Sequence, residues 1–152
     1  MAKEEILLLN DSFPPLIDGV SNAVVNYARC INKGPYSASV VTPEYPGSDD
    51  SAFGYPVIRY PGLDLRKQIG YIAGFPFEPQ TIHSLSKRNI GLIHSHCPMA
   101  SNFLARAIRS QKDVPLVLTY HTKFDIDISN TFHTKTLQHS AIRLLVESVS
   151  AA

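Results

Sequence analysis

The sequence has little of what marks a disulfide-bonded, membrane-spanning or nucleic-acid-binding protein. Its 152 residues include only two cysteines, too few for a disulfide framework. No apolar stretch approaches the roughly 20 residues that cross a bilayer. Lys and Arg number 14 against 13 Asp and Glu, and they form no basic run. The electrostatic footprint of nucleic-acid binding is therefore missing, and no nucleic-acid partner is expected.

Several well-known chemical motifs are missing as well. No GxGxxG follows the first apolar run, which argues against classical dinucleotide binding. The absence of GxxxxGK[ST] and of GxSxG argues against a P-loop protein and an α/β-hydrolase. The start, Met-Ala-Lys-Glu-Glu, leads directly into an apolar run without the features of a signal peptide. We therefore expect a cytoplasmic protein.

What is present is an alternation of short apolar runs with amphipathic stretches. With 44% apolar and 18% charged residues, the chain is globular, and residues 1–152 fit one domain. The alternation predicts an α/β fold, a Rossmann-like open parallel sheet with helices on both faces. Strands are expected at 6–9, 38–42, 57–60, 90–94 and 116–120. Helices are expected from Asp18 to before Pro35 and at 79–87, 99–110 and 136–148, with a polar loop at 121–133.

The first strand, loop and helix form the unit around which the chain is organised. Residues 6–9 are all apolar, as in a strand buried on both faces. The following helix has apolar residues at helical spacing. They are Val20, Ala23, Val24, Tyr27, Ala28 and Ile31. Cys30 in this helix is expected to be a small buried residue. Free N–H groups at the start of the helix make the unit a candidate anion-binding site.

Polar residues follow four of the expected strands, and parallel strands place their carboxyl ends at one edge. We therefore expect these residues to gather where ligands bind in open α/β sheets. They are Asn10, Asp11, Asp18, Gly19, Thr42, His94, His96, Thr119 and His121.

Each of the main candidates has a structural and a functional interpretation. Gly19 suits either a turn with positive φ or close approach of a phosphate to the backbone. Asp18 is either a helix N-cap or a carboxylate that faces an acceptor hydroxyl. His121 either caps a strand end or donates to a phosphate or sugar oxygen, or acts as an acid or base.

The run His94-Ser95-His96-Cys97 looks like part of a metal site, but no further pair of ligands follows at matching spacing. We therefore expect no metal and no cofactor. His94, at the end of a buried strand, is interpreted as a core or rim residue, and His96 as the more exposed candidate.

Together these motifs resemble the N-terminal domain of a retaining, nucleotide-sugar-dependent glycosyltransferase with the two-domain GT-B architecture. The resemblance rests on the order and spacing of five segments, and it covers nearly the whole chain. They are Phe13-Pro14-Pro15 with Asp18-Gly19-Val20, Val40-Val41-Thr42-Pro43, Ile58-Arg59-Tyr60-Pro61, His94-Ser95-His96-Cys97-Pro98 and Thr119-Tyr120-His121-Thr122.

The resemblance implies roles for several residues. Gly19, with Val20, would lie beside the diphosphate of a UDP- or GDP-sugar, and His121 would contact the donor sugar and phosphate. Many members have Gly-Gly-Val where this chain has Asp18-Gly19-Val20. We assign His121 and Asp18 as catalytic candidates.

For the acceptor, we assign the residues His96, Asp11 and Phe75. Most donor-binding residues of the family lie in a second domain that nothing in this sequence matches. The expectation is the acceptor-binding half of an enzyme that transfers a hexose to a lipid or glycan, inactive by itself. A non-catalytic binding module for a glycan, lipid or partner protein is the alternative.

The segment 62–79 mixes aromatic residues with glycines and prolines, which argues against a regular element. Tyr71, Phe75 and Phe77 either pack beneath the segment or form the mouth of an acceptor site. In the second case Arg66 and Lys67 would meet the headgroups of an anionic membrane, so that the protein binds the inner membrane face peripherally.

Overall fold

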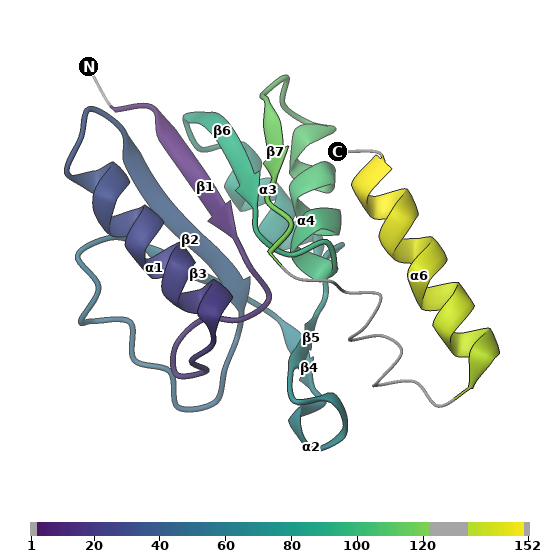
Figure 1. Cartoon of the computed structure of the whole chain (residues 1–152). Coiled ribbons are helices and arrows are strands. Elements are labelled where there is room, and N and C mark those ends of the chain that lie inside the picture. The colour runs from purple at the N-terminus through teal and green to yellow at the C-terminus, as the bar shows by residue number, and fades with distance from the viewer. Residues whose placement is uncertain (1–2, 122–133, 151–152) are drawn as a thin grey trace.

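The computed structural model describes residues 3–121 and 134–150 and has a parallel five-stranded sheet at its centre (Figure 1). The strand order is β3-β2-β1-β6-β7. The strands are β1 (Glu5–Leu9), β2 (Ser37–Pro43), β3 (Val57–Tyr60), β6 (Ile90–Ser95) and β7 (Leu116–Leu118). All four neighbouring pairs are parallel, which confirms the predicted α/β fold.

Two hydrophobic cores lie on opposite faces of this sheet, because side chains alternate along its central strand. Leu7 and Leu9 of β1 point into one core, and Leu8 into the other. The first core is covered by α3 (Pro79–Ser86) and α4 (Ala100–Arg109), and the second by α1 (Gly19–Asn32). The predicted cover of helices on both faces is therefore confirmed (Figure 1).

The remaining helix, α6 (Lys135–Ser150), agrees with the expected last helix. Most of the polar loop expected at 121–133 lies outside the described residues. No helix among the residues that the structure describes has the length and apolar character needed to cross a membrane.

The segment 62–79 is regular, so the expectation against a regular element there is wrong. It contains β4 (Gly62–Asp64), the short helix α2 (Arg66–Ile69) and β5 (Ile72–Gly74), and β4 pairs antiparallel with β5. Gly70 ends α2 with a positive φ, and the glycines at 62 and 74 serve close packing. A Cβ on Gly74 would lie 2.5 Å from the Tyr60 ring, and one on Gly62 would lie 2.8 Å from Ile72. We call residues 62–74 the hairpin; it extends beyond the carboxyl ends of the strands (Figure 1).

The buried stripe of α1 differs from the expected one. The buried residues are Ser21, Val24, Val25 and Ala28, spaced as on one helical face. This places Tyr27 and Cys30 toward solvent, so the expectation of a buried Cys30 is wrong.

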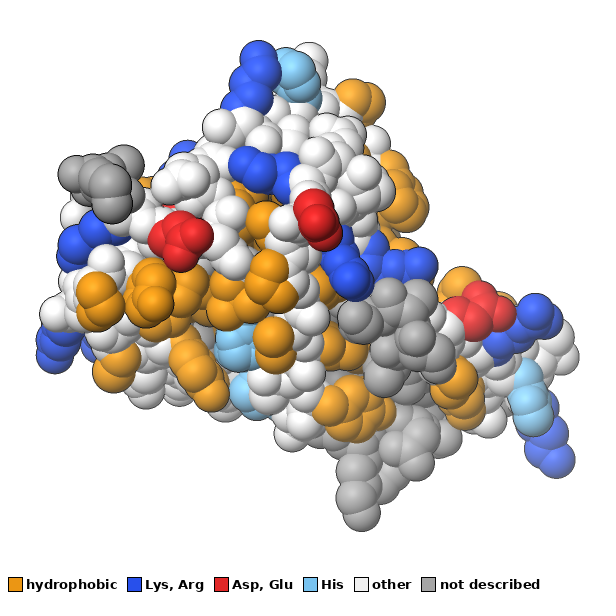
Figure 2. Space-filling model, turned by 90° about the horizontal axis from the view of Figure 1, so that it is seen from above, with side chains coloured by type: hydrophobic (Ala, Val, Ile, Leu, Met, Phe, Trp, Pro, Cys, Tyr) orange, Lys and Arg blue, Asp and Glu red, His pale blue; other side chains and the backbone are white. Residues whose placement is uncertain are grey.

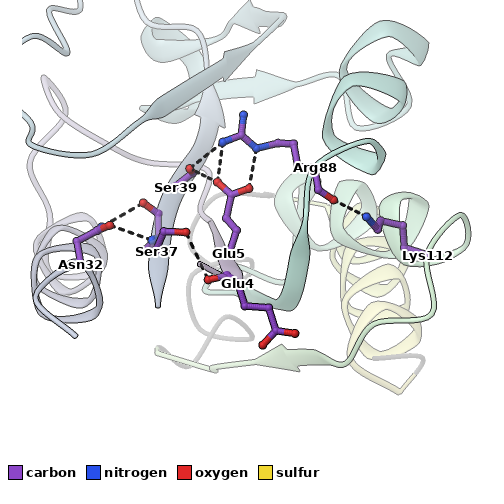
Figure 3. Close-up of polar contacts among 8 residues, drawn as sticks. Glu4, Glu5, Asn32, Ser37, Ser39, Arg88 and Lys112 are labelled. Carbon is purple, nitrogen blue, oxygen red and sulfur yellow. Dashed lines mark hydrogen bonds and ion pairs between the residues drawn. The ribbon is translucent and has the colours of Figure 1, made fainter. Parts of the chain in front are cut away.

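At the amino-terminal edge of the sheet, Glu5, Ser39 and Arg88 form what we call the ion-pair cluster (Figure 3). Arg88 donates to both carboxylate oxygens of Glu5, at 2.7 and 2.6 Å, and Ser39 also donates to Glu5. Seen from this side, basic and acidic side chains are interspersed and form no broad patch of one sign (Figure 2).

Candidate functional site

Three histidines lie together at the carboxyl-terminal edge of the sheet, and we call them the histidine cluster. His94 and His96 come from the end of β6, and His121 follows β7. The ring centroids of His94 and His96 are 4.0 Å apart, and Nδ1 of His96 lies 2.9 Å from Nε2 of His121. Nε2 of His94 lies 2.7 Å from Oγ1 of Thr119. The prediction that these strand ends converge is therefore confirmed.

Backbone pairing fixes the position of this cluster. The His96 amide donates to the carbonyl of Leu9 at 2.8 Å, and the Thr119 amide donates to the carbonyl of Ser95 at 2.9 Å. Both bonds continue the sheet pairing one residue beyond the strands. The histidine backbones therefore share the rigidity of the sheet, which suits a site that must hold a fixed geometry.

Tyr27 of α1 lies against the cluster, a contact that the sequence analysis missed. Its ring centroid is 5.6 Å from that of His94, nearly edge-on, and 5.2 Å from that of His96. Tyr27 remains 44% exposed. The sequence contained one indication of this position, because a tyrosine at the margin of an apolar stripe commonly buries its ring and leaves its hydroxyl in solvent.

His96 is fully buried and His94 only partly, so the expectation that His96 is the more exposed of the two is wrong. Burial, together with the charges that His94 and His121 carry when protonated, lowers the pKa of His96 to about 3. Burial and the charge of a protonated His121 also lower the pKa of His94. Both rings are therefore neutral near pH 7. Among the described residues, no group of His, Cys, Asp and Glu side chains could hold a metal ion.

The start of α1 is built by a capping box. Asp18 accepts a hydrogen bond from the Ser21 amide at 2.7 Å, and the Asp18 amide donates to Oγ of Ser21 at 2.9 Å. The N-cap interpretation of Asp18 is confirmed. The amides of Gly19 and Val20 stand ahead of the first intrahelical bond, which runs from Asn22 to Asp18.

Gly19 is not required by backbone conformation. The positive-φ glycines of the described chain are Gly47 and Gly70, so the turn interpretation of Gly19 is wrong. A Cβ at Gly19 would meet no atom within 4 Å. The space beside its amide is open, which suits the approach of a ligand.

Arg59 of β3, which the sequence analysis did not single out, holds the loop that precedes Gly19. It donates to the Pro14 carbonyl at 2.7 Å and makes a two-pronged contact with Asp50 at 2.8 Å for each bond. Its side chain is only 10% exposed. Such a fork fixes both distance and direction, so Arg59 restricts the loop in front of α1.

Asp11 is half-buried, and its carboxylate is held by α4. Its Oδ1 accepts from the Ser101 amide at 2.8 Å and from the Ser101 hydroxyl at 2.6 Å, which caps the start of α4. Desolvation raises the pKa of this carboxyl. Thr42 is buried within β2. The structure therefore brings the histidines together, leaves Asp11 partly exposed and buries Thr42.

The aromatic residues of 62–79 are exposed, whereas Tyr60 and Ile72 beside them are buried. Tyr71 is 47% exposed, so it does not pack beneath the segment. Phe75 is 51% exposed and Phe77 66%, as the acceptor-mouth hypothesis expects. Arg66 stacks on Tyr45 with its guanidinium carbon 4.9 Å from the ring centroid.

Comparisons with known proteins agree with this geometry. The family model described as Glycosyltransferase Family 4 matches residues 17–149. The chain is 26% identical over 118 residues to the alpha-monoglucosyldiacylglycerol synthase of Acholeplasma laidlawii. The alignment covers 77% of this chain and 29% of that relative.

Proposed function

The chain belongs to Glycosyltransferase Family 4, and we propose that it is the acceptor-binding half of a retaining GT-B glycosyltransferase. The proposed reaction transfers a hexose from a UDP- or GDP-sugar to a lipid or glycan. One observation carries the proposal: the carboxyl edge of the sheet holds both an open helix start at Gly19 and a histidine cluster in which Nδ1 of His96 faces Nε2 of His121. Both elements offer N–H donors to a diphosphate without a metal.

On the donor side, the amides of Gly19 and Val20 and the ring of His121 bind the diphosphate. Tyr27, whose ring touches the cluster, follows Gly19 by eight residues, about 12 Å along the helix. Because helical side chains tilt toward the N-terminus, the Tyr27 ring lies closer to the Gly19 amide than this backbone distance. A ligand that reaches both ends must be extended, as a diphosphate joined to a sugar is.

In the transfer step, negative charge builds up on the departing diphosphate as the bond to the anomeric carbon breaks. N–H donors fixed before the reaction stabilise that charge without reorganising. Asp18 uses Oδ1 for the helix cap, and within the described part of the chain Oδ2 has no protein partner. We assign Oδ2 to the acceptor hydroxyl. A second domain supplies the remaining donor contacts.

On the acceptor side, we place a lipid substrate beside the hairpin, with Phe75 at its mouth and the half-buried Asp11 behind it. The relative's name specifies a glucosyl diacylglycerol product, which favours a diacylglycerol-like lipid as the acceptor. Arg66 and Lys67 beside exposed aromatic residues suit an anionic bilayer.

Liposome co-sedimentation tests this membrane contact. Pelleting of the protein should rise with the anionic lipid content and fall for the double variant Phe75→Ser with Lys67→Ala. Equal pelleting of wild type and double variant would contradict it.

The sharpest test of the diphosphate site removes one N–H group. Proline is favoured at the first position of a helix, and Asp18 is extended, as a residue before proline must be. Gly19→Pro therefore deletes the amide and keeps the helix. Gly19→Ala is the matched control, because its Cβ enters open space and the amide remains.

The measurement is titration of the isotope-labelled chain with UDP and GDP, followed by NMR. We expect shift changes centred on Gly19, Val20 and His121, abolished by Gly19→Pro and kept by Gly19→Ala. Changes elsewhere, or equal binding by both variants, would overturn the assignment. Specific binding of the acceptor lipid without any nucleotide binding would instead favour the non-catalytic module.

A further inference from the structure

The buried ring of His96 makes a hydrogen bond with the ring of His121. The ring is fully buried, and its one hydrogen bond with a side chain joins Nδ1 to Nε2 of His121 at 2.9 Å. Within the residues described, its other nitrogen, Nε2, is buried without a partner. Burying a polar ring with an unsatisfied nitrogen costs free energy, which an apolar ring of the same size would avoid. The imidazole at this position is therefore explained by the one hydrogen bond that it makes.

We propose that His96 is a positioning residue that donates its Nδ1 hydrogen to His121 and thereby presents Nδ1–H of His121 to the diphosphate. The proposal rests on the proposed function, because it takes His121 as a donor to that ligand. It assigns to His96 a role through His121 in place of direct contact with the acceptor.

The proton arrangement follows from counting hydrogens. A neutral imidazole has one N–H, and one of the two facing nitrogens must carry the hydrogen of the shared bond. If His96 donates, the hydrogen of neutral His121 is on Nδ1, the nitrogen left for a ligand. If His121 donates, its Nδ1 has no hydrogen and repels phosphate oxygen. Only the first arrangement makes a neutral His121 a phosphate-binding donor.

The unpartnered atom agrees with this arrangement. When the His96 hydrogen is on Nδ1, Nε2 carries none, so no N–H group is buried without an acceptor. Charge also agrees, because His96 has His94 and His121 beside it and gains no stabilisation as a cation. The ring remains a neutral donor throughout the reaction.

The first experiment determines the histidine tautomers in the chain without nucleotide. Long-range 1H–15N correlation spectra of histidine-labelled protein at pH 7.5 distinguish nitrogens with and without hydrogen. We expect a protonated Nδ1 and a bare Nε2 at both His96 and His121. In His96→Phe, His121 should return to the mixture of tautomers of a solvated imidazole. His83→Ala, in an exposed part of α3, is the control and should change neither ring.

A hydrogen on Nε2 of His121 in the wild-type chain would overturn the proposal, whatever the variants do. This readout needs no donor sugar, so it fails or succeeds separately from the proposed function. If the tautomers are as expected and UDP and GDP leave Gly19 and His121 unshifted, the proposed function fails and the positioning geometry remains.

The second experiment is kinetic and uses the complete enzyme that contains this chain. His96→Phe should lower kcat/KM about tenfold to a hundredfold, the range for partners that orient a functional imidazole. His96→Asn keeps an N–H donor on the equivalent atom and should recover part of the loss. Equal activity of the Phe and Asn variants, both folded, would mean that His96 only fills space.

Discussion

The two edges of the sheet carry polar clusters of opposite character. At the amino edge, the ion-pair cluster joins groups of opposite charge, and Arg88 meets both oxygens of Glu5 (Figure 3). At the carboxyl edge, the histidine cluster joins three groups of the same kind, and one buried nitrogen has no partner among the described residues. Every carboxylate oxygen of the first cluster therefore has a donor, whereas the second cluster contains a buried polar atom without a partner among the described residues.

Electrostatics makes the same distinction. Burial would raise the pKa of Glu5, but hydrogen bonds from Arg88 and Ser39 hold it below its usual value. Nothing offsets burial at His96, whose pKa falls to about 3. The ion-pair cluster therefore stabilises a charged group, whereas the surroundings of His96 disfavour one. Departures from full satisfaction are expected at functional sites, which is why we place the chemistry at the carboxyl edge.

Breaking the ion-pair cluster should have the largest effect on stability. Arg88→Met leaves the carboxylate of Glu5, which is 7% exposed, without its partner. Removing one member of a fully buried ion pair costs about 3–5 kcal/mol, and solvent screening at the Arg88 side chain, which is 36% exposed, should lower this to about 2–3 kcal/mol. Urea denaturation should show this loss as a lower midpoint at unchanged slope. The double variant Glu5→Met with Arg88→Met should recover much of it, and a single variant as stable as wild type would contradict the contrast between edges.

The corresponding change at the carboxyl edge should affect catalysis and leave stability nearly unchanged. His121→Ala in the complete enzyme removes a donor to the departing diphosphate, worth about 3 kcal/mol in the transition state. His121 is partly exposed, so its loss leaves no large cavity. Turnover and melting temperature should be measured on the same sample. A lowered melting temperature with normal kinetics would show that His121 only caps a strand end.

These contrasts also separate what the sequence could predict from what it could not. The apolar run of β1 and the helical spacing after Gly19 are local patterns, and they predicted the sheet and α1. Convergence of the histidines followed from topology alone, since parallel strands end at one edge. The packing of individual side chains was not predictable. Tyr27 covers His96 because two segments far apart in the chain meet, and no local pattern records that.

Glycine was the least predictable residue. In the hairpin, the glycines at 62 and 74 permit close packing against Ile72 and Tyr60, whereas sequence alone favoured an irregular loop. Gly19 has neither a packing contact nor a positive φ. The same residue type thus serves two purposes that only tertiary contacts distinguish.

The pH dependence of stability should sharpen the comparison between edges. The pKa of His96 is about 3 in the folded chain and ordinarily 6.5, so only the unfolded chain takes up this proton between those limits. Stability should fall below pH 6.5 by about 1.4 kcal/mol per pH unit, or about 2 kcal/mol at pH 5. Glu5, whose pKa is lowered from 4.5, contributes losses only below that pH.

Urea midpoints at pH 7, 6 and 5 for wild type and His96→Phe measure this effect. The variant should be as stable as wild type or more so at pH 5, because it has no imidazole to protonate. The raised pKa of Asp11 acts in the opposite direction, because it favours the folded state as the pH falls. This contribution is the same in both proteins and cancels when one stability curve is subtracted from the other. Parallel curves for the two proteins would mean that His96 titrates normally in the folded chain.

The smallest effect concerns Asp18, where the structural and the catalytic roles meet in one side chain. Asp18→Ala removes the bond to the Ser21 amide, and loss of an N-cap costs about 1 kcal/mol. Asp18→Asn keeps an oxygen that caps nearly as well but removes the charge. We expect Asn to preserve the melting temperature and lower kcat, because Oδ2 no longer carries charge toward the acceptor hydroxyl. Ala should lower both. If the Asn variant turns over like wild type, Asp18 only caps α1, and the helix start acts in the reaction through its amides alone.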